Sequence, residues 1–181
     1  MGNAIVVMGL SEADISSLGL ALAMSFGIPF VDADDLHAPD PIARIAAGQP
    51  LRDDNRCPWL SRGASHLADT ATYPGGGVVA SSALKCAYRN RIRTGAGGAA
   101  MFVLLDIPPQ TAHAHPCGRK DDFMPTSLIE TQFATLQMPS RGEAGVITLD
   151  VTHGVDEIVS PARTAFGARG VDKNVEQEAC R

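Results

Sequence analysis

The chain has 181 residues, 45% of them hydrophobic and 19% charged, a balance that suits one globular domain whose core needs no cross-links. The net charge of −5 and the lack of a basic cluster interleaved with aromatic residues argue against nucleic acid as a partner. The apolar runs are too short to span a bilayer and no basic segment precedes the first of them, so we expect a cytoplasmic protein with no membrane partner. The four cysteines show no C-x-x-C spacing, and no metal site is predicted from them.

The first predicted element is a buried strand, because the apolar run AIVVM that ends at Met8 is typical of a parallel sheet. After Gly9 the apolar residues follow helical spacing, and a strand, a turn and a helix in that order are the setting of a phosphate-binding loop. The pattern of such a loop is G-x-x-x-x-G-K-[ST], but the eight positions from Gly9 read GLSEADIS. Asp14 and Ile15 therefore stand where the pattern has its second Gly and its Lys, and Ser16 stands at the final hydroxyl position.

The next predicted elements follow a group of carboxylates. The letters IPFVDADD predict a second strand that ends in Asp32, Asp34 and Asp35, and strand ends are where sheets of this class place their chemistry. A helix over residues 36–48 comes next. A polar loop then leads to a further helix from Pro58 to Ala71, because proline is favoured at the first helical position.

Strand and helix continue to alternate towards the C-terminus. The runs VVASSAL, AAMFVLLD and GVITLD predict the third, fourth and fifth strands, with helices over Lys85–Arg93 and near Val155–Phe166. Alternation of this kind predicts a parallel sheet with helices on both faces and active groups at the carboxyl ends of the strands. We expect a single domain over residues 1–168, in which about 108–138 form a small lid, and a polar tail over 169–181.

Four stretches of the sequence, VDADDLH, GQPLRDDNRCPWL, SSALKCAYRNRIR and FMPTSLIETQFATLQMP, resemble the gluconate kinases, small P-loop sugar-acid kinases related in fold to shikimate and nucleoside monophosphate kinases. The resemblance runs in order from Ile5 to about Val159. It implies a three-layer α/β fold of the P-loop NTPase class with a five-stranded parallel sheet and a lid. It also implies phosphorylation of the 6-hydroxyl of D-gluconate by ATP with Mg²⁺, in a protein that is often a homodimer.

The resemblance assigns roles to the residues after the second strand. Asp32 and Asp34 match the paired aspartates of the family, of which one orients magnesium water and the other holds the acceptor hydroxyl and is placed to remove its proton. On spacing alone, capping of the next helix by these carboxylates is an equally good interpretation. His37 matches the family histidine, whose expected role is to donate to a gluconate hydroxyl.

The loop before the third helix supplies a candidate for the substrate carboxylate. Arg56 is that candidate, because a guanidinium binds a planar carboxylate through two parallel hydrogen bonds. The alternative is an ion pair of Arg56 with Asp53 or Asp54 that holds the loop. Trp59, in the same stretch, is expected to belong to the core rather than to stack on a ligand.

The stretch after the third strand adds three more residues to the expected substrate site. Ser82 is expected to hydrogen-bond the substrate, whereas Lys85 and Arg89 match basic positions of the family and face either phosphate or solvent. Further along the chain, the resemblance places Phe133 and Leu136 on a helix that closes the lid region, where they are expected to pack against the body of the protein.

The loop after the first strand departs from the family pattern. Asp14 adds a negative charge and Ile15 removes the ammonium group, so this loop should repel the polyphosphate that the family loop attracts. It is also expected to change shape, with the Asp14 side chain capping the next helix, because Asp tolerates positive φ less well than Gly. If a nucleotide binds, the residues expected to contact it are Gly9, Ser11, Asp14, Ile15, Ser16 and Ser17, with Mg²⁺ on Ser16 and Asp32.

The predicted lid departs from the pattern as well. Arg119 matches one of two family arginines and is the expected transition-state cation, whereas His115 replaces the other and Asp121–Phe123 replace a Gly-His-Phe triplet. We therefore predict weak or absent binding of ATP. Two interpretations remain open: a gluconokinase that turns over with an unusual loop, and an inactive pseudokinase that binds a sugar acid or a protein partner.

Overall fold

The computed structural model describes residues 3–10, 14–36, 53–72, 75–98, 100–108, 129–140, 142–150 and 155–169. Within these ranges strands and helices alternate, as the sequence predicts. The elements in chain order are β1 (Asn3–Gly9), α1 (Ile15–Phe26), β2 (Phe30–Asp32), the 3₁₀ helix η2 (Ala33–Leu36), α3 (Asp53–Thr70), β3 (Gly76–Ala80), α4 (Cys86–Gly95), β4 (Ala100–Asp106), α6 (Ile129–Thr135), β5 (Val146–Asp150) and α7 (Val155–Arg169).

The strands form one sheet in the order β2-β3-β1-β4-β5. β1 lies at the centre, and its Val6 pairs with Val79 of β3 on one side and with Phe102 of β4 on the other. Every pairing in the sheet is parallel, so the carboxyl ends of all the strands meet at one edge. The expected five-stranded parallel sheet is confirmed.

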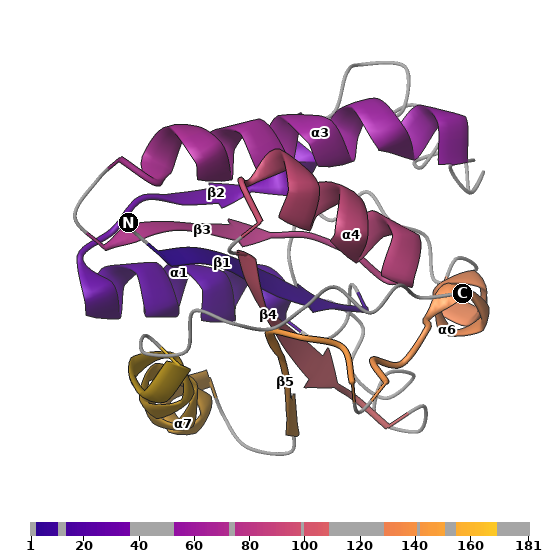
Figure 1. The fold of residues 1–181 in the computed structure, drawn as a ribbon. Coiled ribbons are helices and arrows are strands. Elements are labelled where there is room, and N and C mark those ends of the chain that lie inside the picture. The colour runs from indigo at the N-terminus through magenta and orange to yellow at the C-terminus, as the bar shows by residue number, and fades with distance from the viewer. Residues whose placement is uncertain are drawn as a thin grey trace.

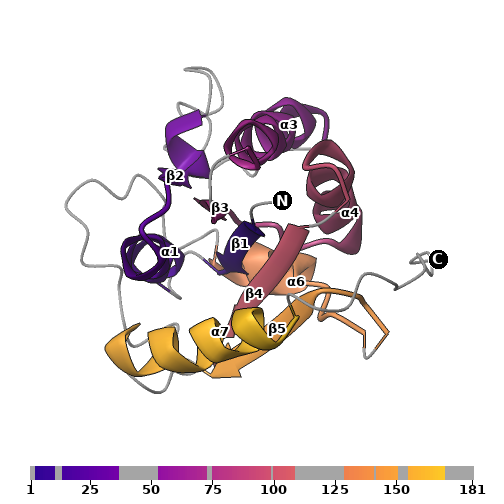
Figure 2. The ribbon, with the colours of Figure 1, turned by 60° about the vertical axis from the view of Figure 1, so that its left-hand side comes forward.

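Helices cover both faces of this sheet and give three layers (Figure 1). Consecutive residues of a strand point to opposite faces. Val6 therefore belongs to a hydrophobic cluster with Trp59 and Leu60 of α3, whereas Val7 belongs to a second cluster with Leu18 of α1. In Figure 2, α1 and α7 lie side by side under the second face. Because both faces are covered, the central strands are apolar along most of their length instead of alternating with polar residues.

The start of α3 differs from the predicted one. The helix begins at Asp53, inside the stretch predicted as a loop, and Pro58 lies within it. The carboxylates of Asp53 and Asp54 occupy the first turn, where the helix dipole favours negative charge, and this early start leaves Pro58 inside the helix without one backbone hydrogen bond. Residues 37–48, predicted as a helix, and 109–128, predicted as most of the lid, lie outside the described residues.

The predicted packing of three aromatic and aliphatic side chains is confirmed. Trp59 is buried in the core, and Phe133 and Leu136 are partly buried and pack against the body of the protein. α7 ends at Arg169, slightly beyond the predicted end of the last helix. In the described part of the chain, no helix is both long enough and apolar enough to cross a membrane.

Gly77 of β3 lies too close to α3 to accept a side chain. A Cβ at this position would lie 2.3 Å from Thr70 Oγ1 and 2.8 Å from Thr70 Cβ. We expect Gly77→Ala to lower the free energy of unfolding by about 1–3 kcal/mol, because the strand and the helix must move apart. Thermal unfolding measures this effect against Gly142→Ala, since a Cβ at Gly142 meets no atom within 4 Å. Equal melting temperatures for the two variants would contradict the prediction.

Candidate functional site

The turn after β1 places Asp14 at the N-cap of α1 in the left-handed region, with φ 56° and ψ 37°. Glycine adopts this conformation without steric cost, and Asp14 is the single non-glycine residue with positive φ in the described ranges. Its carboxylate makes no capping hydrogen bond to the backbone, and Ser17 Oγ donates to Asp14 Oδ1 at 2.6 Å. The expectation that Asp14 would avoid positive φ and cap α1 through its side chain is therefore wrong.

Ile15 points into the protein. Its side chain is 8% exposed and belongs to the hydrophobic cluster that contains Leu18 of α1 and Ile158 of α7. The position at which a phosphate-binding loop has its Lys thus contributes apolar contact and no charge. Among the described residues the only lysine is Lys85, and its ammonium group is paired with Asp53.

Ser16 and Asp32 lie in contact, although they are far apart in the sequence. Ser16 Oγ, in the first turn of α1, donates to Asp32 Oδ2 at the end of β2. Asp32 Oδ1 accepts the backbone N–H of Asp34 at 3.0 Å, which fixes the carboxylate against the start of η2. A hydroxyl and a carboxylate are hard oxygen ligands of the kind that Mg²⁺ prefers, so this pair fits the metal that the resemblance implies.

A second polar cluster lies between α3 and the start of α4. Lys85 Nζ donates to Asp53 Oδ1 and Oδ2 at 2.8 and 3.0 Å, and Tyr88 Oη donates to Asp53 Oδ1 at 2.5 Å. Lys85 Nζ lies 5.2 Å and Arg56 Cζ lies 5.9 Å from the centroid of the Tyr88 ring. The two cations predicted for the sugar acid therefore lie against the same aromatic ring, which is a favourable setting for positive charge.

Hydrogen bonds and burial set the charges in this cluster. The hydrogen bond from Lys85, followed by the one from Tyr88, lowers the pKa of the Asp53 carboxyl, and the bond to Asp53 raises the pKa of Lys85. Burial raises the pKa of the Tyr88 phenol, and its hydrogen bond to Asp53 adds to that effect. These shifts favour an ionised Asp53 carboxyl, a protonated Lys85 and a neutral Tyr88 phenol.

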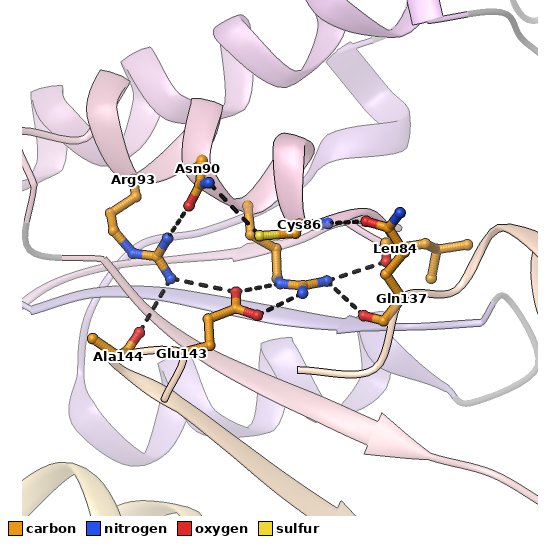
Figure 3. Close-up of polar contacts among 8 residues, drawn as sticks. Leu84, Cys86, Asn90, Arg93, Gln137, Glu143 and Ala144 are labelled. Carbon is orange, nitrogen blue, oxygen red and sulfur yellow. Dashed lines mark hydrogen bonds and ion pairs between the residues drawn. The ribbon is translucent and has the colours of Figure 1, made fainter. Parts of the chain in front are cut away.

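Arg89 faces neither phosphate nor solvent, which corrects the two alternatives expected for it. The side chain is 1% exposed and forms an ion pair with Glu143, in which Arg89 Nε and Glu143 Oε1 are 2.5 Å apart. The guanidinium also donates to the carbonyl oxygens of Leu84 and Gln137. Arg89 thus joins α4 to the segment after α6 and to the turn before β5. Figure 3 shows Leu84, Gln137 and Glu143, its partners in this network.

Asp34 and Arg56 belong to η2 and α3, two elements that are joined by hydrogen bonds. Asp34 is exposed in η2, and Arg56 is half-buried in the first turns of α3. Trp59 Nε1 of α3 donates to the carbonyl oxygen of Ala33, and Arg62 Nε donates to that of Leu36 at 2.7 Å. These bonds hold η2 against α3. A shared cleft of Asp34, Arg56 and His37 stays a prediction.

The remaining predicted site residues divide into two groups. Ser82 lies half-buried in the turn after β3, where its carbonyl oxygen accepts the backbone N–H of Leu84 at 2.9 Å, and Gly9 is the last residue of β1. The other group lies outside the described residues: Ser11, His37 and Arg119.

Sequence patterns did not indicate the observed contacts of three residues that organise this region. Tyr88 lies three positions after Lys85, so helical spacing along α4 was the available indication that it contacts the same partners. Asp53 was considered only as a partner of Arg56. Glu143 lies in a turn between α6 and β5, and no local pattern indicates that its side chain is only 5% exposed.

The strand order and the helices on both faces of the sheet give the fold of a class of protein, the P-loop kinases. The shikimate kinase of Aquifex aeolicus shares this fold, with a TM-score of 0.62 over 93% of this chain and 98% of that one, at 16% sequence identity. No family model matches the sequence.

Nearer relatives define the family. The chain is 31% identical to the thermosensitive gluconokinase of Escherichia coli (strain K12) over 166 residues, which are 91% of this chain and 87% of that protein. It is also similar to the crystal structure of a gluconokinase from Sinorhizobium meliloti 1021, with a TM-score of 0.79 and 39% identity over 92% of this chain and 95% of that one. The chain belongs to the gluconokinase family.

Proposed function

We propose that this chain binds D-gluconate or a similar sugar acid at the carboxyl ends of β2 and β3, and that its transfer of phosphate from ATP to that acid is slow or absent. The first part is supported by the relatives, which are gluconokinases. The family reaction converts ATP and D-gluconate to ADP and 6-phospho-D-gluconate. The second part rests on one observation, the burial of Ile15 in the hydrophobic core at the position of the catalytic Lys.

Side chains at the edge of the sheet have the chemistry that a sugar acid requires. Arg56 is proposed to bind the carboxylate, with Lys85 against the same Tyr88 ring as the second positive group. Asp34 is proposed to hold the 6-hydroxyl and to accept its proton as phosphate transfer begins. The hydrogen bonds between α3 and η2 support this assignment, because they join the helix that contains Arg56 to the 3₁₀ helix that contains Asp34.

The nucleotide side lacks the groups that stabilise a transferring phosphoryl group. In a working loop the Lys places positive charge on that group, and backbone N–H groups surround the phosphates. Ile15 supplies no charge, and the exposed carboxylate of Asp14 lies at the N-terminus of α1, where a helix favours the binding of an anion from the ligand. Loss of one preorganised donor costs on the order of 10²–10³ in rate.

One alternative is favoured by a specific observation. Ser16 and Asp32 are in contact and are both suited to hold Mg²⁺, which supplies neutralising charge to the phosphates when it is bound. Retention of this pair of candidate metal ligands favours a gluconokinase that turns over in spite of its altered loop. An inactive pseudokinase that binds only a sugar acid or a protein partner would have no need of these ligands.

Isothermal titration calorimetry tests the proposal on the purified protein, with D-gluconate and with ATP plus Mg²⁺ in separate experiments. We expect D-gluconate to bind and ATP to bind very weakly. Asp34→Ala should weaken the binding of D-gluconate, whereas Asp35→Ala is the matched control because its carboxylate is the next one in η2 and has no proposed role. Turnover at the rate of a working gluconokinase, abolished by Asp34→Ala, would refute the proposal and establish the alternative.

A further inference from the structure

A buried ion pair joins α4 to the turn that precedes β5 (Figure 3). Arg89 Nε and Nη2 donate to Glu143 Oε1 and Oε2 at 2.5 and 2.6 Å, so the guanidinium and the carboxylate meet as two parallel forks. The two side chains are 1% and 5% exposed. Arg93, one turn further along α4, lies 3.7 Å from Glu143 Oε1 through Nη2.

The same guanidinium fixes two backbone segments. Arg89 Nη1 donates to the carbonyl oxygens of Leu84 at 3.1 Å and of Gln137 at 3.0 Å. The backbone N–H of Gln137 also donates to the carbonyl oxygen of Leu84 at 2.9 Å. The loop between β3 and α4 is therefore bound to the segment that follows α6.

The Gln137 side chain completes this connection at the start of α4. Its Oε1 accepts the backbone N–H of Cys86 at 2.8 Å, and Cys86 is the first residue of the helix. The first N–H groups of a helix have no partner within it, and Lys85 at the N-cap makes no side-chain capping bond. The cap of α4 thus comes from a segment about fifty residues away in the sequence.

We propose that Arg89 and Glu143 are positioning residues for the sugar-acid site. With Gln137 they form a latch that fixes the backbone at Leu84 and hence the place from which Lys85 reaches Asp53 and the Tyr88 ring. The inference rests on the proposed binding of a sugar acid beside Lys85. An apolar pair would fill the same volume, but it would leave the carbonyl oxygens of Leu84 and Gln137 without the Arg89 donor.

The test compares Arg89→Met/Glu143→Met with a control on the same helix. The double variant removes both charges and keeps apolar bulk. Arg91→Met is the matched control, because Arg91 is exposed and donates to Ser61 Oγ, away from the latch. Two quantities are measured: amide hydrogen exchange at Cys86 and Gln137, and the dissociation constant of D-gluconate by calorimetry. A melting curve establishes that each variant is folded.

We expect the double variant to exchange these amides faster and to bind D-gluconate about tenfold more weakly, whereas Arg91→Met should match the wild type in both. Arg89→Lys keeps the positive charge but cannot make two parallel hydrogen bonds to the carboxylate. It should bind D-gluconate more tightly than the double variant but more weakly than the wild type. Gln137→Ala is the second test and leaves the ion pair intact. It should speed exchange at Cys86 and weaken D-gluconate binding by a smaller factor, so the proposal can be judged even if the double variant does not fold.

Two results would overturn the positioning role. Exchange at Cys86 and Gln137 that stays at the wild-type rate would show that the latch does not hold this loop. Faster exchange with unchanged affinity would show a structural role alone. If the wild type does not bind D-gluconate, the proposed function fails, and the exchange rates still decide whether the latch holds the loop.

Discussion

Glu143→Ala is expected to lower the free energy of unfolding by about 3–5 kcal/mol, because it removes one partner of a buried ion pair and leaves the other charge buried. Arg89 would lose both acceptors of its fork, and Arg93 would lose its ionic partner. Burial already lowers the pKa of Arg93, and the charge of Glu143 opposes that shift. Urea denaturation followed by circular dichroism measures the change.

The double variant Arg89→Met/Glu143→Met is the control for this loss. Replacing a whole buried ion pair by apolar residues is often close to neutral, whereas removing one partner is not. We therefore expect the double variant to be more stable than Glu143→Ala. A Glu143→Ala protein within about 1 kcal/mol of the wild type would contradict the prediction, because a change that small is typical of exposed ion pairs.

Much of the fold follows from local patterns in the sequence. The apolar runs of β1, β3 and β4 have no alternation, which is what strands covered on both faces require, and β1 and β3 are each followed by a segment with helical spacing. Such patterns act within a few residues. The contact of Ser16 with Asp32 agrees with the parallel topology, because the carboxyl ends of β1 and β2 lie at the same edge, whereas the order of the strands in the sheet is not determined by local patterns.

Features that depend on tertiary contacts could not be predicted in this way. Pro58 was expected to begin a helix, but the acidic residues before it already begin one. The buried position of Arg89 depends on Glu143, which is 54 residues away and lies in another element. A basic residue on a helix surface is usually exposed, so the sequence around Arg89 favours solvent, and only the packing of α4 against the turn before β5 reverses this.

Asp14 shows how the expectation from the sequence and the observed structure differ within one loop. From the residue type we expect Asp14 to avoid positive φ, whereas the observed φ is 56°. Asp is among the residues that enter the left-handed region more often than most, and the Ser17 hydroxyl stabilises the carboxylate there. The backbone thus has a conformation suited to glycine at the position where the loop pattern has Gly, although the side chain is not glycine.

Asp14→Gly/Ile15→Lys is therefore expected to raise the affinity for ATP with Mg²⁺ by at least about tenfold. Glycine takes the φ of residue 14 without strain, so the first change removes a carboxylate and requires no remodelling of the turn. The second change places an ammonium group at the N-terminus of α1. Calorimetry with ATP and Mg²⁺ measures the affinity of the double variant and of each single variant.

The burial of Ile15 decides how the controls are chosen. A Lys at this position must carry its stem past the core and bring its charged group to the surface, because a buried ammonium group is strongly disfavoured. Ile15→Met keeps an apolar side chain of similar volume and should leave the affinity for ATP at the wild-type value. Asp14→Gly alone should raise that affinity less than the double change, because it removes repulsion and adds no attraction. If the folded double variant binds ATP no better than Ile15→Met, the obstacle to nucleotide binding lies outside Asp14 and Ile15.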